Sequence, residues 1–135
     1  MAMDRLLLCT ILIAQLLAVG NVRGQEMPSA VYVNITPDFI TNFDEGARLK
    51  YLKASVSLKV KGESESKIRY HLPSIKNNLI ILFSAQAEEN LTSTVGRETL
   101  RREALDEVKN VMAMLERNGD QEVEDLYFTN FVVQQ

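Results

Sequence analysis

The sequence has no tryptophan, one cysteine and one histidine among its 135 residues. A lone Cys9 excludes an intramolecular disulfide. A zinc site needs three or four ligands, so we interpret His71 as a solvated histidine on the flank of a helix, with metal ligand or catalytic base as the alternative. The 15 basic and 18 acidic residues give a net charge of −3, which does not indicate a nucleic-acid surface. A chain of this length forms one domain at most.

Motifs that carry chemistry are also missing. The six glycines form no phosphate-binding loop, and there is no G-x-S-x-G turn. The carboxylates gather at the expected ends of elements, where charges are usually solvated, and nothing in their spacing indicates the cleft that paired acid–base catalysis needs. We therefore expect no cofactor, no metal and no catalytic residue.

Residues 1–24 differ from the rest of the chain. A short start carrying Arg5 precedes the apolar run "LLLCTILIAQLLAVG", which ends at Gly20. A spanning helix needs about 20 apolar residues, whereas the central region of an export signal needs roughly 7–15. Small residues before Gln25 fit cleavage between Gly24 and Gln25. We predict a secretory signal peptide over 1–24, with a short membrane anchor as the alternative, and a linker over 25–30.

Three segments have the composition of strands. In "YLKASVSLKVK", ending at Lys61, apolar and polar residues alternate, so a strand over 49–61 directs one face to a core and Lys53, Lys59 and Lys61 to the other. Residues 31–43 contain Pro37, which predicts an edge strand or two short strands meeting at a break. Residues 122–133 predict a terminal strand that pairs with 49–61 and becomes more covered toward its end.

Two segments have helical spacing. Apolar residues recur at intervals of three and four over 64–87, where Pro73 predicts a kink or a division into two helices. A second helix is expected over 94–117, after a loop over 90–94 in which Ser93 is the N-cap, and Asn-Gly at 118–119 supplies its left-handed end. The order strand, strand, helix, helix, strand predicts an α+β domain with both helices on one face of a mainly antiparallel sheet.

Four stretches, in order, resemble the flagellar basal-body-associated FliL family. They are "YVNITPDFITNF", "YLKASVSLKVK", the region "HLPSIKNNLIILFSAQAEENLTSTVGRETLRREALDEVKNVM", and the ending "VEDLYFTNFVVQ". The resemblance covers about 31–135. It implies a periplasmic domain similar to the scaffold domain of stomatin-like proteins, near the inner membrane, which associates with flagellar stator units, forms homo-oligomeric rings and supports torque and swarming. It implies no catalytic residues.

The short N-terminal segment departs from this family, whose members keep a full spanning helix and a longer linker. Two functions are therefore carried forward. One is a FliL-like, non-enzymatic motor protein that self-associates or docks on the basal body; the other is an exported binding module, unrelated to the motor, that contacts a protein or ligand through the lysine-bearing face. The interface residues that we expect are Lys53, Lys59 and Lys61 of the lysine-bearing face in both cases, together with Phe39 and Phe43 if a ring forms.

Overall fold

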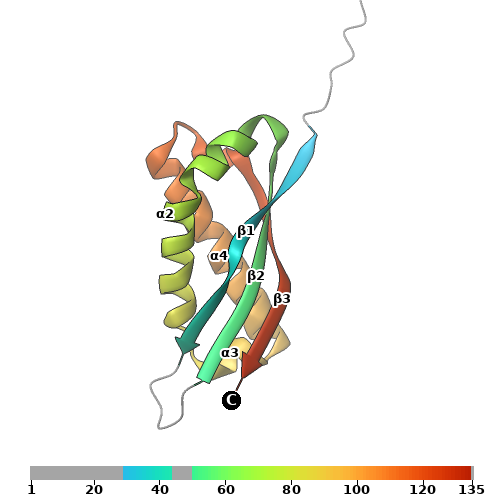
Figure 1. Cartoon of the computed structure of the whole chain (residues 1–135), viewed down its shortest axis with the longest axis vertical. Helices are drawn as coiled ribbons and strands as arrows, with labels where there is room; N and C mark the ends of the chain where they lie inside the picture. The colour runs from blue at the N-terminus through green and yellow to red at the C-terminus, as the bar shows by residue number, and fades with distance from the viewer. Residues whose placement is uncertain (1–28, 44–49, 135) are drawn as a thin grey trace, which may run out of the picture.

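The computed structural model describes residues 29–43 and 50–134 and has the α+β fold expected from the sequence (Figure 1). The predicted segment 1–24, its cleavage between Gly24 and Gln25, and all but the last two residues of the 25–30 linker lie outside the described residues. The elements in chain order are β1 (Ala30–Phe43), β2 (Lys50–Lys61), η1 (Gly62–Ser64), α2 (Glu65–Ser84), α3 (Glu88–Thr92), α4 (Thr94–Leu115), η2 (Gly119–Glu122) and β3 (Val123–Gln134).

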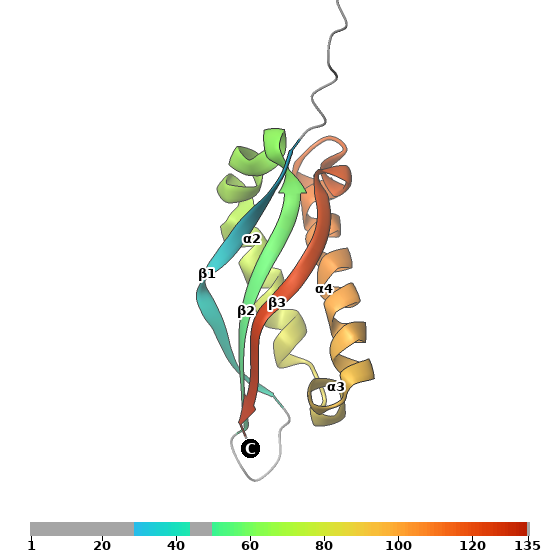
Figure 2. The ribbon, with the colours of Figure 1, turned by 90° about the vertical axis from the view of Figure 1, so that its right-hand side faces the viewer.

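The three strands form one antiparallel sheet in the order β1-β2-β3. The alternating segment is the central strand β2. The terminal segment pairs with it as predicted, with Leu58 opposite Leu126 and Leu52 opposite Val133. The apolar ending of the chain is therefore an integral strand at one edge of the sheet (Figure 2).

Pro37 lies in the other edge strand, so of the two alternatives for residues 31–43 the edge strand is correct. β1 is one strand, yet its pairing with β2 shifts between Ile35 and Phe39, so three residues of β1 are left without a directly opposed partner. Proline has no N–H to give to a sheet ladder, which confines it to edges and irregular positions. Phe39 and Phe43 follow this shift and both point into the core, where they are 1% and 2% exposed.

The long helices α2 and α4 lie on one face of the sheet (Figures 1 and 2). Each buries the stripe that its spacing predicts against the apolar face of the strands. The buried residues of the two helices are Ile68, Ile75, Leu79 and Phe83 on α2, and Leu100, Ala104, Val108, Val111 and Met112 on α4. No helix within residues 29–43 and 50–134 has the length and apolar character needed to cross a bilayer.

The helix α2 contains Pro73 and continues through it from Glu65 to Ser84. Of the two alternatives left by the sequence, a single bent helix is correct, and its ribbon changes direction in its first part (Figure 1). The ring of Pro73 removes one backbone hydrogen bond and crowds the carbonyl of Arg69, four residues earlier. The carbonyl of Arg69 loses its helical donor, and because Arg69 and Pro73 are both exposed this acceptor is not left in the core.

Two local predictions at the start of α4 had different outcomes. Ser93 caps the helix as predicted: its Oγ accepts a hydrogen bond from the backbone N–H of Gly96 at 3.0 Å. The loop expected over 90–94 was wrong, because Glu88–Thr92 forms the short helix α3. That turn folds because it buries Leu91, which is 1% exposed.

The chain after α4 has the left-handed residue predicted for the Asn-Gly pair at 118–119. Asn118 takes the left-handed conformation with φ 57°, whereas Gly119 does not have a positive φ. A side chain at position 119 would not fit, since a Cβ there would lie 2.2 Å from the carbonyl oxygen of Met112.

The expected increase in coverage along β3 was also wrong. Val123 and Leu126 near its start are buried, while Phe131 and Val133 near its end are half-buried. The first turn of α4 lies beside Phe131, and β3 runs on past that end of the helix (Figure 2). The last residues of the strand therefore lack the helical cover that the first ones have.

Candidate interaction surface

The fold leaves uncovered the face of the sheet opposite the helices (Figure 2), and we call it the outer sheet face. Its side chains alternate along each strand with the buried ones. Its members include Tyr32, Asn34, Ile40 and Asn42 on β1, Tyr51, Lys53, Ser55, Ser57, Lys59 and Lys61 on β2, and Glu124, Tyr127, Asn130, Val132 and Gln134 on β3.

Five large apolar or aromatic side chains are exposed on this face. They are Tyr32 (60% exposed), Ile40 (70%), Tyr51 (38%), Tyr127 (37%) and Val132 (49%). Solvated sheet faces usually carry polar residues, and a group of exposed apolar side chains on one face is typical of an interaction site. Sequence reasoning missed these residues. Tyr51 could have been found, because it lies an even number of residues from Lys53, Lys59 and Lys61 and so shares their face of β2.

The rows of the outer sheet face combine apolar and basic groups. Lys53 lies opposite Ile40 on one side and Val132 on the other, so one cation is flanked by two exposed aliphatic side chains. Beyond the row of Ser55 and Asn130, Tyr127 lies opposite Ser57 and Tyr32 opposite Lys59, and the two ring centroids are 6.2 Å apart across β2. Ser57 is only 4% exposed.

The three lysines predicted for this face do lie there, but two are paired within the chain. Lys59 Nζ lies 2.9 Å from a carboxylate oxygen of Glu124, and Lys53 Nζ lies 3.8 Å from one of Asp38. The hydrogen bond and the charge of Glu124 raise the pKa of Lys59 above its ordinary value. Part of the positive charge is therefore neutralised locally, and the apolar side chains become the more distinctive feature of the surface.

Phe39 and Phe43, the other two predicted interface residues, belong to the core. The ring of Phe39 packs edge-on against Phe83 of α2 with centroids 5.1 Å apart. A partner cannot reach either side chain while the sheet and helices stay together, so the interface prediction is corrected to exclude them. Both phenylalanines keep the period-two spacing of the buried Val33 and Ile35 across the register shift, so the spacing along β1 was a usable signal of their burial.

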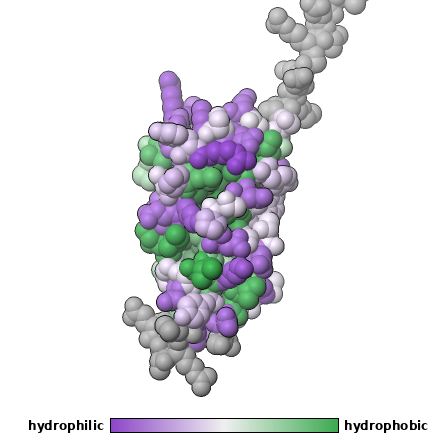
Figure 3. Space-filling view, in the orientation of Figure 1, coloured by the Kyte–Doolittle hydropathy of each residue, from purple (hydrophilic) through white to green (hydrophobic). Residues whose placement is uncertain are grey.

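The helical side of the molecule also exposes apolar residues, including Tyr70, Ile81 and Met114. Figure 3 views the molecule from the side of α2 and shows hydrophobic patches separated by hydrophilic ones. Scattered apolar side chains of this kind are normal on protein surfaces. They differ from the outer sheet face, where apolar residues occupy neighbouring strands of one surface.

His71 connects the two long helical segments. Its Nε2 lies 2.9 Å from Oε1 of Glu116, just beyond the end of α4, and the ring packs against Tyr70. The side chain is mostly buried, so the expected solvated histidine is instead part of a packing contact. The described residues include no group of three or more histidine, cysteine or acidic side chains that could hold a metal ion.

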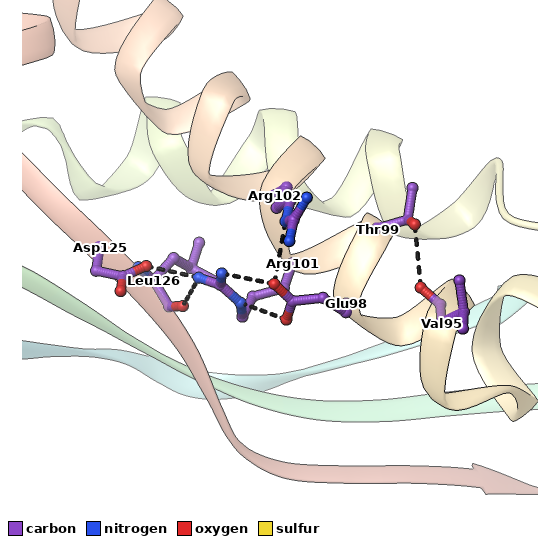
Figure 4. A network of polar contacts seen from close by, with 7 residues as sticks. All are labelled: Val95, Glu98, Thr99, Arg101, Arg102, Asp125 and Leu126. Carbon is purple, nitrogen blue, oxygen red and sulfur yellow. Dashed lines mark hydrogen bonds and ion pairs between the residues drawn. The ribbon is translucent and has the colours of Figure 1, made fainter.

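A second feature lies at the other edge of the sheet, between α4 and β3. Arg101 donates two hydrogen bonds to the carboxylate of Glu98, one to Asp125 Oδ1 at 2.6 Å, and one to the carbonyl oxygen of Leu126 (Figure 4). Arg102 also donates to Glu98 at 3.1 Å, the favourable i to i+4 arrangement on a helix. This network attaches the helix to the terminal strand.

Charges in the network are held in their ionised forms. Hydrogen bonds from Arg101 and then from Arg102 lower the pKa of Glu98 from 4.5 to about 2. The hydrogen bonds and charge of Glu98 and Asp125 outweigh partial burial and raise the pKa of Arg101. Burial acts to raise the pKa of Asp125, but the N–H of Leu126, the hydroxyl of Tyr127 and the guanidinium of Arg101 together lower it.

Comparisons with known proteins agree with this architecture. Residues 32–134 match the family model described as flagellar basal body-associated protein FliL. The flagellar protein FliL of Aquifex aeolicus (strain VF5) is 27% identical over 105 residues, which cover 77% of this chain and 62% of that protein. The match thus spans less than two thirds of the relative's length. Because the family match includes all three strands and both long helices, the chain belongs to the FliL family of flagellar basal body-associated proteins.

Proposed function

We propose that this protein is a non-enzymatic component of the flagellar motor that docks on stator units, or on further copies of itself, and thereby supports swimming and swarming. The observation that carries the proposal is the outer sheet face, with five exposed apolar side chains on a surface that the helices leave open. Membership of a family associated with the flagellar basal body supplies the setting.

The composition of the outer sheet face suits a protein partner. Burying an exposed side chain such as Ile40 contributes roughly 1–2 kcal/mol, because part of its surface is already covered by its neighbours. Tyrosine brings a large apolar ring and a hydroxyl, which favours it at protein interfaces. If copies assemble in a ring, this face of one subunit must meet a different face of the next, since a ring needs a heterologous contact.

A direct test replaces the two aliphatic residues beside Lys53. Ile40→Asp and Val132→Asp each place a carboxylate opposite the lysine in the register, which is a favourable cross-strand pair, so the fold should tolerate them. Each removes an apolar contact of about 1 kcal/mol and should weaken docking roughly fivefold. We expect smaller swimming zones in soft agar and reduced co-purification with stator proteins.

Met114→Asp is the matched control. Met114 is 75% exposed and lies on α4, on the helical side of the sheet. It should leave motility and co-purification unchanged, and all three variants should keep the melting temperature of the parent protein. Normal swimming and swarming by both outer-face variants under viscous load would argue against the proposed function.

We also propose that the domain is exported and works in the periplasm close to the inner membrane. The support is the signal-like pattern of residues 1–24 and the basal-body association of the family. The mass of the protein isolated from cells tests the first step. A chain beginning at Gln25 indicates a released domain, a chain beginning at Met1 or Ala2 indicates a retained anchor, and accumulation in the cytoplasm would contradict export.

A further inference from the structure

The two edges of the sheet are protected to very different degrees. Along β1, Pro37 and the register shift interrupt the strand, and side chains of α2 close the gap: Lys76 Nζ donates to the carbonyl oxygen of Pro37 at 2.7 Å, and Ser84 Oγ lies 2.6 Å from Thr41 Oγ1. Proline, irregular pairing and charged groups are the usual means of preventing an edge from pairing with another chain.

The edge formed by β3 also has irregular pairing, with register shifts against β2 at Glu124 and Thr129, but it contains no proline and no charged side chain after Asp125. The stretch "LYFTNFVVQ", residues 126–134, contains no proline, no glycine and no charged residue. Side-chain hydrogen bonds cap the strand at Leu126, whose N–H donates to Asp125 Oδ1 at 2.8 Å and whose carbonyl accepts from Arg101 at 3.1 Å. Beyond Leu126 the strand keeps its β propensity and remains an open edge that a further strand can join.

A groove of about 370 Å³ runs beside this edge, between β3 and the start of α4. Half-buried phenylalanines form its apolar floor, with the rings of Phe128 and Phe131 4.9 Å apart and Phe128 packed on Phe83. The helical wall contributes Thr94, Arg97, Glu98 and Arg101. A strand added to β3 directs alternate side chains to the helical side of the sheet, and those side chains enter this groove.

The charges of the groove specify the occupant. The guanidinium of Arg101 already forms ion pairs with Glu98 and Asp125 and donates a hydrogen bond to the carbonyl of Leu126. Arg97 is exposed and lies with its guanidinium 5.9 Å from the ring centre of Phe131, and no ion pair involves it within residues 29–43 and 50–134. Arg97 thus presents a cation at the rim of an apolar groove, where a carboxylate of an incoming segment can pair with it.

We propose that the β3 edge is a strand-addition site for an extended peptide segment that carries a carboxylate and apolar side chains on the same face. Backbone hydrogen bonds to residues 127–134 hold the segment. Its apolar side chains cover Phe128 and Phe131, and its carboxylate pairs with Arg97. A second copy of β3 fits less well, because residues 126–134 have no carboxylate to offer. The site shares Tyr127, Asn130 and Val132 of β3 with the outer sheet face, but its groove opens toward α4, so residues of β1 distinguish the two proposals.

The probe is the capped peptide acetyl-Val-Thr-Glu-Thr-Val-Thr-amide, in which valine, glutamate and valine share one face when extended. Titration into the full-length protein at low salt, followed by backbone amide NMR, should shift residues 127–134 and Arg97 in a saturable way. Replacing the peptide glutamate by glutamine should weaken binding about two- to fivefold, the range for an exposed ion pair. Methylating the backbone nitrogens of alternate peptide residues should abolish binding, because a methylated nitrogen cannot donate to β3.

Charge reversal identifies the cation. Arg97→Glu should disfavour the glutamate peptide and favour the same peptide with lysine in its place, whereas Arg117→Glu, an exposed control beyond α4, should change neither affinity. The proposal is wrong if the probe does not saturate at millimolar concentration, if the N-methylated peptide binds equally well, or if the shifts appear at Tyr32 and Ile40 of β1 instead of at β3 and Arg97. A β3-linked dimer of the protein, seen by sedimentation and blocking the probe, would overturn the peptide as occupant.

Discussion

Leu126 is the residue whose truncation best reports on the terminal strand. It lies in β3 opposite Leu58 of β2, and both side chains are completely buried beneath the helices. Leu126→Ala removes three carbon atoms from a packed site between the sheet and the helices. The sheet and the helices cannot easily move closer to fill the cavity that is left. Leucine-to-alanine changes at such sites reduce the free energy of unfolding by about 2–5 kcal/mol. We expect a loss near 3 kcal/mol, a large part of the roughly 5–15 kcal/mol that domains possess.

The assay is urea denaturation followed by circular dichroism, with thermal melting as a second measurement. A loss of 3 kcal/mol should lower the melting temperature by more than roughly 10 °C in a domain of this size. Val132→Ala, on the same strand but 49% exposed, should change stability by less than about 0.5 kcal/mol. Leu126→Met, which keeps the volume, should cost less than about 1.5 kcal/mol. A loss below about 1 kcal/mol for Leu126→Ala would refute the claim that β3 is an integral strand.

Three further predictions concern the ends of α4. The pKa of Glu98 is depressed from 4.5 to about 2, so its ion pairs stabilise the fold above pH 4.5 and are lost as the pH falls toward 2; the melting temperature of Glu98→Gln should therefore vary less over that interval than that of the parent. Gly119→Ala should destabilise the protein by roughly 1–3 kcal/mol in urea denaturation, because its Cβ would overlap the carbonyl of Met112. Ser93→Ala should cost about 1 kcal/mol by the same assay, since it removes the N-cap.

Each of these predictions has its own control. Glu103→Gln, an exposed carboxylate on the same helix, should leave the acid dependence of melting unchanged. Ser93→Asp should restore most of the stability lost in Ser93→Ala, because aspartate is also a good N-cap. Full stability of Gly119→Ala would contradict the close approach of η2 to the end of α4.

The strands and long helices were predictable because their patterns are local. β2 alternates over its whole length, and the stripes of α2 and α4 repeat at three and four residues. Local patterns also identify the Ser93 cap and the Asn118 stop. The pairing of β3 with β2 followed from a weaker argument, that an apolar strand at a terminus persists only when it is paired and packed.

The features that escaped prediction depend on tertiary placement. α3 contains five residues and one buried apolar side chain, too little to give a periodic signal. Coverage along β3 depends on where α4 begins relative to the strand. The burial of Phe39 and Phe43 is an exception, because both keep the period-two spacing of Val33 and Ile35 across the irregularity at Pro37, and alternation was a usable signal for it.

The two candidate sites show the same limit. The lysines of the outer sheet face were predictable from alternation, but their pairing with Glu124 and Asp38 joins neighbouring strands. The groove unites Arg97 of α4 with Phe131 of β3, residues that are far apart in the sequence and meet only in the folded chain. Neither short motif nor composition marks such a surface.

Site-specific photo-crosslinking in motile cells tests most directly whether the outer sheet face is the docking surface. A photoreactive phenylalanine analogue is placed at Tyr32, at Ile40 or, as the helical-side control, at Met114. The account predicts crosslinks from Tyr32 and Ile40 to a basal-body protein or a second copy of this chain, with little or none from Met114. Crosslinks from position 114 together with no crosslinks from positions 32 and 40 would contradict it.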